Sequence, residues 1–343
     1  MRSRQAGPIA VDTENPFETV IVECAKLMIR QLPQARIRAL YTNHRTSRNS
    51  RERAVILDST FPGWSLDTTL AKLDGPARDP NFVDPRNCLA LWARPPPPVR
   101  RLVDVIQSRL HDVAPSKWFM PPERLHLTVL DMANSLTEAE MGEMLSSICP
   151  GISDVVNYSS KHLSSLIKPM VSYDVAGLAL SFVPAAGEAN THQGEIDRAD
   201  GHLDHHSHSY TYHHLRRDIF SLVNGLGAKV APRYIVPSAH ITIARFTSQD
   251  GFVCRNGDGN SSGGCDRNRR SLDTKRIRQF ISEIDSINEW LEREYWPRQE
   301  GSVSARGNWV VGEGGNGLEC RKGRIWYGGR ESIVIEEGLR HAN

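Results

Sequence analysis

A pattern of histidine, apolar residue, threonine and apolar residue occurs twice in this chain. The copies read His-Leu-Thr-Val at 126–129 and His-Ile-Thr-Ile at 240–243, both between apolar flanks. Because side chains alternate between the two faces of a β-strand, the histidine and threonine of each copy share one face. Each copy therefore predicts a strand with a polar face and an apolar face that a core can bury. If two such strands meet, two imidazoles and two hydroxyls enter one cleft.

Similar elements precede the two copies. Hydrophobic periodicity predicts the order strand, helix, motif strand in both halves of the chain. The six segments are 87–94, 99–113 and 125–130 in the first unit, and 175–183, 212–226 and 238–245 in the second. This order predicts two similar lobes related by a pseudo-two-fold axis, each of which supplies one motif strand to a shared cleft.

The chain divides into three predicted parts. Residues 1–84 form a helical, arginine-rich N-terminal extension, residues 85–330 form the domain with both motifs, and residues 331–343 form a tail. Two loop insertions are predicted inside the domain, at 184–210 and 251–270, because both segments are rich in polar residues and glycine.

Further elements are expected outside the two units. They are a helix over 16–45 interrupted near Pro33, a short helix opened by a capping box of Thr137 and Glu140, a helix over 273–294, and strands over 308–311 and 324–327. Six arginines between Arg36 and Arg53 could contact an RNA backbone, but a run of charge more often forms a solvated helix face.

Composition excludes several classes of protein. The net charge is +2 in 343 residues, so no strongly basic nucleic-acid binder is indicated. The six cysteines contain no CxxC pair, which argues against a disulfide framework or a zinc knuckle. No apolar run approaches 18 residues, and the first residues lack the apolar segment of a secretory signal. We therefore expect an intracellular protein, cytoplasmic or nuclear, that is monomeric and binds no membrane.

The motif residues suit chemistry at phosphorus. Two imidazoles, His126 and His240, can act as base and acid on opposite sides of one bound group near neutral pH. The hydroxyls of Thr128 and Thr242 can hydrogen-bond phosphoryl oxygens and stabilise their developing charge. The set therefore suits in-line attack on a phosphate with no metal or other cofactor. The structural alternative, a half-buried strand that happens to hold histidine and threonine, is weaker for two matching copies than for one.

The two motifs and the order of elements around them resemble those of the two-histidine (2H) phosphoesterase superfamily, over roughly residues 85–330. The resemblance implies an α+β, bilobal fold with two antiparallel sheets that face a central cleft and helices outside. It also implies metal-independent cleavage or formation of phosphoesters in RNA or nucleotides. His126 and His240 then take the catalytic positions, and Thr128 and Thr242 the phosphate-binding ones.

The chain departs from the compact bacterial members of that family. Its motif histidines are 114 residues apart, and it carries the N-terminal extension and the two insertions. In these features it is similar to a fungal branch described as RNA ligase or cyclic nucleotide phosphodiesterase-like.

Three further residues are candidates for substrate contacts. Arg245 could bind phosphate, although strict alternation places it on the face opposite His240. Trp326 and Tyr327 could stack on a base, with core packing as the alternative.

A histidine-rich segment at 202–214 offers a competing metal site. Its histidines are His202, His205, His206, His208, His213 and His214. No cysteine is near, and its aspartates lie in a predicted loop rather than on a rigid frame, so we expect no metal there. His213 and His214 begin the following helix, where Arg216 and Arg217 are expected on the exposed face.

The sequence thus favours a metal-independent phosphodiesterase that hydrolyses a cyclic phosphate, in particular the 2′,3′-cyclic phosphate of an RNA end or a nucleotide. Two enzymatic alternatives use the same site: a 2′-5′ RNA ligase and an RNA 3′-end exonuclease. A non-catalytic module that binds RNA or nucleotide is the third alternative. The sequence does not decide which histidine is the base.

Overall fold

The computed structural model describes eight segments of the chain. They are residues 15–26, 33–114, 116–185, 210–230, 235–254, 272–297, 307–323 and 332–338. The predicted strand over 324–327, with Trp326 and Tyr327, lies outside these segments, as do most of the two predicted insertions and His202 to His208.

The strands of the described segments form one antiparallel sheet. Its order is β7-β4-β5-β6-β3-β1-β8-β9, with β2 paired to β6. The strands are β1 (Asn87–Ala93), β2 (Trp118–Phe119), β3 (Leu127–Leu136), β4 (Ser164–Tyr173), β5 (Gly177–Pro184), β6 (Ala239–Arg245), β7 (Trp309–Val311), β8 (Glu319–Gly323) and β9 (Ser332–Glu337). The α+β class is confirmed, and so are the two motif strands, which are β3 and β6.

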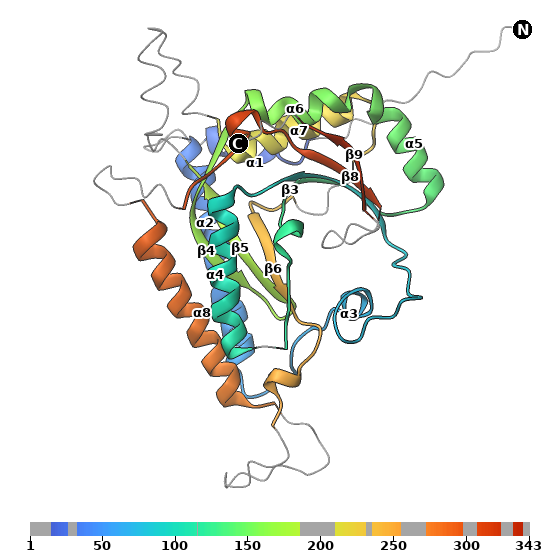
Figure 1. Ribbon diagram of the computed structural model, residues 1–343. Helices are drawn as coiled ribbons and strands as arrows, with labels where there is room; N and C mark the ends of the chain where they lie inside the picture. The colour runs from blue at the N-terminus through green and yellow to red at the C-terminus, as the bar shows by residue number, and fades with distance from the viewer. Residues whose placement is uncertain are drawn as a thin grey trace, which may run out of the picture.

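The sequence predicted two sheets, and the structure joins them. One half-sheet contains β4 to β7 and the other contains β1, β3, β8 and β9. The halves meet where β3 pairs with β6 through a single residue pair, Leu127 and Ile241. In Figure 1, β8 and β9 run across the top of the molecule while β4 to β6 descend from it, so the sheet bends sharply at this junction.

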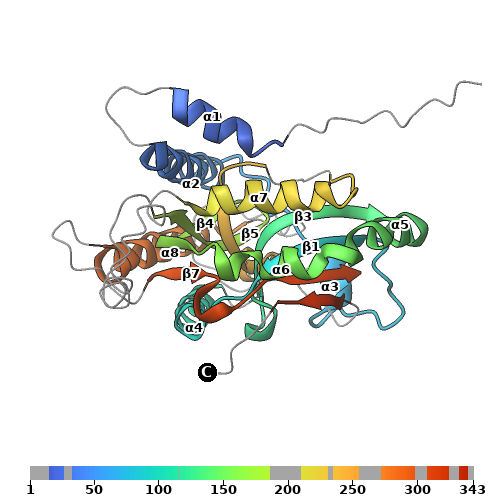
Figure 2. The same ribbon diagram turned by 90° about the horizontal axis from the view of Figure 1, so that it is seen from above.

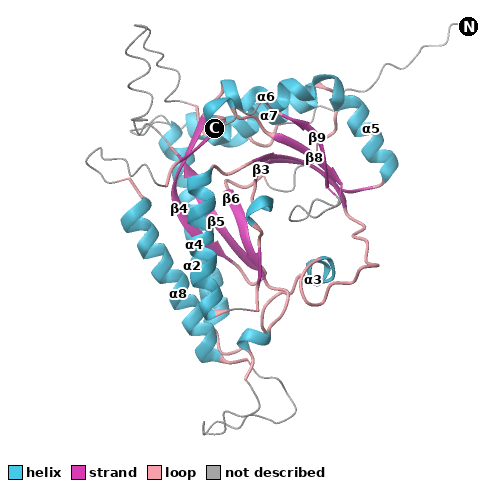
Figure 3. Ribbon diagram, in the orientation of Figure 1, coloured by secondary structure: helices cyan, strands magenta, loops and turns pink. Residues whose placement is uncertain are grey.

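Helices cover the outside of the bent sheet (Figure 3). α4 (Pro97–Val113) packs against α8 (Thr274–Tyr295), which covers β4. The second half-sheet is covered by α5 (Glu138–Ile148), α6 (Ile152–Lys161) and α7 (Tyr212–Gly225). Four single-turn 3-10 helices connect these elements, at Pro122–Arg124, Cys149–Gly151, Asp250–Phe252 and Glu313–Gly315. No helix in the described ranges has an apolar stretch long enough to cross a bilayer.

Local sequence explains where these helices begin and what they bury. The Asp273 carboxylate caps α8 by accepting from the backbone N–H of Lys275 and Arg276. The predicted capping box is present at α5, where Thr137 and Glu140 bond each other's backbone N–H. α8 buries one stripe at helical spacing, consisting of Ile277, Phe280, Ile281, Ile284, Ile287 and Leu291.

The N-terminal region differs from its prediction. Its helices are α1 (Glu18–Lys26), α2 (Pro33–Leu57) and the short α3 (Thr68–Leu73). Pro33 starts α2 rather than only interrupting a helix, because the first helical turn needs no backbone N–H from proline. Figure 2 shows α1 and α2 beyond α7 on one side of the molecule, and α4 on the opposite side.

This region shares its core with the rest of the chain. Phe17, Ile37, Tyr41 and Ile56 are buried in the same hydrophobic cluster as the motif strands. α2 packs directly against β4 and β5. The predicted boundary at residue 84 therefore does not separate two cores. The expectation of a solvated arginine face is also wrong for Arg45, which is 4% exposed.

Candidate active site

The two motifs meet at the junction between the half-sheets. In the antiparallel register that pairs Leu127 with Ile241, His126 lies across from Thr242. In the same register Thr128 lies across from His240. The apolar motif residues Leu127, Val129, Ile241 and Ile243 are buried at 0–1% exposure. The two histidines and two threonines are only half-buried. The structure thus brings His126, Thr128, His240 and Thr242 together on one face, as expected from alternation.

A buried arginine fastens the two motif segments to each other. Arg216 in α7 donates from Nε to the carbonyl of Val129 at 3.1 Å and from Nη1 to the carbonyl of Val236 at 3.0 Å. The neighbouring Tyr212 hydroxyl donates to the Thr128 carbonyl at 3.2 Å. Arg216 is 3% exposed, so its expected position on the outer face of the helix is wrong. It bridges the backbones of both motif segments.

His126 is held in one plane and one tautomer. Its ring stacks on Trp92, with centroids 3.7 Å apart and planes 13° apart. Its Nδ1 lies 2.7 Å from the Arg124 carbonyl. A carbonyl only accepts hydrogen bonds, so Nδ1 carries the proton and Nε2 has a lone pair at neutral pH. Burial lowers the pKa of His126 to about 3, opposed by this hydrogen bond and aided by nearby cations.

A charged network supports the tryptophan under His126. The Glu319 carboxylate accepts from Arg94 at 2.7 Å and from Arg321 at 3.1 Å. Both guanidinium groups lie over the Trp92 ring, 5.1 Å and 5.2 Å from its centroid. Two arginines that share one buried carboxylate leave this wall of the site positive, which suits an anionic substrate.

His240 has a more adaptable partner. Its Nδ1 lies 2.9 Å from the Ser238 hydroxyl, which can donate or accept. With the hydroxyl as donor, the imidazole proton is on Nε2. Burial, together with the charges of Arg48 and Arg245, lowers the pKa of His240 to about 4.

Arg245 reaches the same face through a β-bulge. Gly177 pairs with Arg245 and Ala179 pairs with Thr242, so two steps along β5 match three steps along β6. Gly177 and Ala179 share a face, and their partners therefore share it too. The close approach requires glycine, because a Cβ at position 177 would lie 2.6 Å from the Ala244 carbonyl oxygen. The bulge explains why strict alternation placed Arg245 on the wrong face.

A cavity of about 80 Å³ lies between α2 and the β4–β5–β6 half-sheet. Of the predicted site residues, His240, Thr242 and Arg245 line it, whereas His126 and Thr128 do not. Its other lining residues are His44, Arg45, Arg48, Ser172, Tyr173, Asp174, Gly177, Leu178, Ala179, Ser181 and Ser238. Arg45 and Arg48 belong to the arginine run for which an RNA contact was the less favoured interpretation, whereas His44 was not predicted. The spacing of His44 and Arg48 places them on one helix face.

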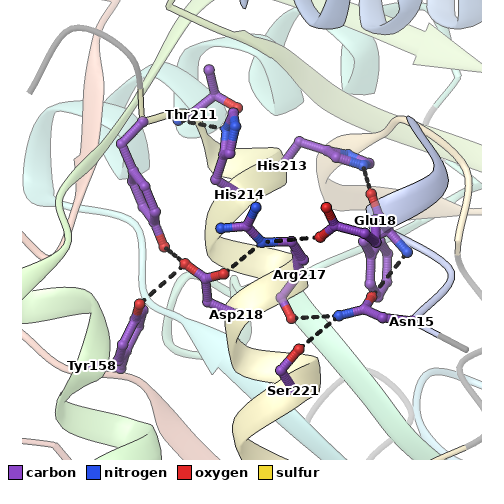
Figure 4. Close-up of polar contacts among 11 residues, drawn as sticks. Asn15, Glu18, Tyr158, Thr211, His213, His214, Arg217, Asp218 and Ser221 are labelled. Carbon is purple, nitrogen blue, oxygen red and sulfur yellow. Dashed lines mark hydrogen bonds and ion pairs between the residues drawn. The ribbon is translucent and has the colours of Figure 1, made fainter. Parts of the chain in front are cut away.

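The described residues contain no group of three or more histidine, cysteine or acidic side chains that could hold a metal. His213 and His214 make structural contacts (Figure 4). His213 Nε2 donates to the Phe17 carbonyl at 3.0 Å, and its Nδ1 accepts from the Tyr41 hydroxyl at 3.0 Å. His214 lies 2.8 Å from the Thr211 hydroxyl. His213 therefore ties the start of α1 and the middle of α2 to α7.

Comparisons with known proteins find likenesses among solved structures. No family model matches the chain, and no curated protein matches it. The structure of Kluyveromyces marxianus Usb1 with uridine monophosphate aligns at a TM-score of 0.34 and 11% identity, over 74% of this chain and 98% of that one. A second structure of Kluyveromyces marxianus Usb1 aligns at 0.30 and 12%, over 75% and 99%. Both TM-scores are below 0.5.

We predict that the bridge made by Arg216 is needed for stability. Arg216→Ala removes the guanidinium donor of the buried Val129 carbonyl, whereas the Val236 carbonyl still accepts from the Ser238 N–H. The free energy of unfolding should therefore fall by about 1–3 kcal/mol. The matched control is Arg217→Ala, which removes the adjacent, more exposed arginine paired with Glu18 and Asp218. Urea unfolding of both variants measures the difference. Equal losses would show that the bridge has no special role.

We also predict that both motif histidines are neutral in the substrate-free protein from pH 5 to 8. Their pKa values are lowered from 6.5, so the unfolded chain binds these protons before the folded chain does. Stability should therefore fall as the pH drops below 6.5 toward these folded-state values. Imidazole NMR signals of His126 and His240 should stay constant from pH 8 to 5. Titration of either ring near pH 6.5 would contradict the prediction.

Proposed function

We propose that this protein is a metal-independent phosphodiesterase that hydrolyses a cyclic phosphate, the 2′,3′-cyclic phosphate of an RNA end or a nucleotide. The observation that carries the proposal is the register at Leu127 and Ile241, which opposes the two motifs about a local two-fold axis. A phosphate at this junction has an imidazole and a hydroxyl on each side. Two imidazoles supply both proton transfers that the hydrolysis needs.

The hydrogen bonds at Nδ1 suggest how the roles divide. His126 has a lone pair on Nε2 and a carbonyl at Nδ1, which stabilises the imidazolium as it forms. It is therefore suited to remove the proton from the attacking water. Once protonated, His240 donates from Nδ1 to the Ser238 hydroxyl, which can accept as well as donate, and it carries its other proton on Nε2. It is therefore suited to protonate the departing ribose oxygen.

In the proposed reaction, the water oxygen attacks phosphorus in line with the ribose oxygen that leaves. The new P–O bond forms as the bond to ribose breaks, and the product is a phosphate monoester. His126 keeps the proton from water, and His240 gives its proton to ribose. The bound phosphate anion raises the pKa of both histidines, so the proton on His240 enters the site with the substrate. Thr128, Thr242 and Arg245 stabilise the charge on the phosphoryl oxygens.

We predict that either histidine is essential for turnover. With a nucleoside 2′,3′-cyclic phosphate and EDTA present, His126→Ala or His240→Ala should lower kcat by about 10²–10⁴-fold. His111→Ala, which removes an exposed imidazole on α4, is the control and should keep the activity. Thermal unfolding of each variant checks that the fold is retained.

Near-normal turnover in either motif variant would rule out the two-histidine mechanism. Wild-type protein that binds nucleoside monophosphate without turning over the cyclic phosphate would support a binding module instead.

A further inference from the structure

The cavity beside His240 has the composition of an anion site. Its charged lining consists of three arginines, Arg45, Arg48 and Arg245, and one carboxylate, that of Asp174. The arginines come from two elements far apart in the sequence, since the first two are in α2 and the third ends β6. The helix that lay outside the predicted domain thus adds two positive charges to the wall of the cavity.

Arg45 is a buried cation that has no carboxylate partner among the described residues. Its Nη1 donates to the carbonyls of Lys168 at 2.6 Å and Ser181 at 3.3 Å, while its buried Nε has no acceptor in the described part of the chain. Burial lowers the pKa of Arg45 to about 10. A buried guanidinium without a counter-charge is costly, and an anion in the adjoining cavity would offset that cost.

The Asp174 carboxylate fixes the position of Arg48 and uses only part of its set of N–H donors. Its Nη2 donates to Oδ2 of Asp174, and Asp174 is itself fixed by the backbone N–H groups of Ala176 at 2.7 Å and Gly177 at 2.9 Å. Asp174 is the one acceptor that the described residues provide for Arg48, whose side chain is 42% exposed. A guanidinium has five N–H donors in a rigid fork, so most of this fork can bind a ligand in the cavity.

The α2 wall of the cavity lies beside the place of the reacting phosphate, which shares the second-motif side of the same cavity. In the proposed reaction that phosphate contacts both motifs, whereas the cavity is lined by residues of the second motif and by none of the first. A water-sized void takes about 10–15 Å³. A cavity of about 80 Å³ therefore has room for several water molecules, and a group the size of a phosphate fits in it.

We infer that the α2 wall of this cavity binds a second, non-reacting phosphate group of the substrate, with Arg48 and Arg45 as its ligands. The inference rests on the proposed function, and it narrows the substrate class to nucleotides or RNA ends that carry a phosphate next to the reacting one. A nucleoside cyclic phosphate without this neighbour fills only part of the site.

The test compares two nucleotides by isothermal titration calorimetry at one fixed salt concentration: adenosine 3′-monophosphate and adenosine 3′,5′-bisphosphate. Wild type should bind the bisphosphate about tenfold or more tightly than the monophosphate, and Arg48→Ala should lose this preference. Arg48→Gln, which keeps polar contacts without the charge, should lose most of it.

The matched control is Arg53→Ala. Arg53 is on the same helix, is 45% exposed and is paired with Asp285, but it does not line the cavity. This variant should keep the preference of the wild type. No preference in the wild type, or an equal preference in Arg48→Ala and Arg53→Ala, would overturn the inference. The protein could also prefer the bisphosphate in an Arg48-dependent way and yet not hydrolyse a cyclic phosphate. That result would support the second phosphate site and refute the proposed reaction.

Discussion

The contact on which this structure depends is one residue pair, Leu127 with Ile241. It joins two half-sheets and sets the register of the two motif strands, so that one imidazole and one hydroxyl lie on each side of the junction. Arg216 strengthens the same junction through carbonyls of Val129 and Val236. A shift of one residue would turn every motif side chain to the opposite face. The geometry of the site therefore follows from strand pairing.

Positive charge around two half-buried imidazoles is the second constraint. Arg94 and Arg321 lie near His126, and Arg48 and Arg245 lie near His240. Burial and these charges keep both rings neutral when the site is empty. An anionic phosphate reverses the effect, because it favours the protonated imidazole that the surrounding cations disfavour. In the proposed reaction, substrate binding and proton uptake are thus coupled, which makes the acid available only when phosphate is present.

Local patterns predicted much of the fold, and non-local contacts account for the rest. Alternation placed the motif residues on the correct face, and helical periodicity gave α4, α7 and α8. The bulge that turns Arg245 into the cavity depends on pairing with β5, and the stacking of Trp92 on His126 depends on pairing between β1 and β3. The role of α2 depends on packing across more than 100 residues of sequence. These contacts have no local signature, so charge and periodicity favoured a solvated helix face over a contact with an RNA backbone.

The most direct test of the account is whether the two motif histidines bind one phosphate. Inorganic phosphate can be titrated into ¹⁵N-labelled protein while the imidazole signals of His126 and His240 are followed. If the junction is a single site, both rings should shift with the same dissociation constant, and both should move toward the protonated form. A response from only one ring, or two clearly different dissociation constants, would contradict a shared two-histidine site.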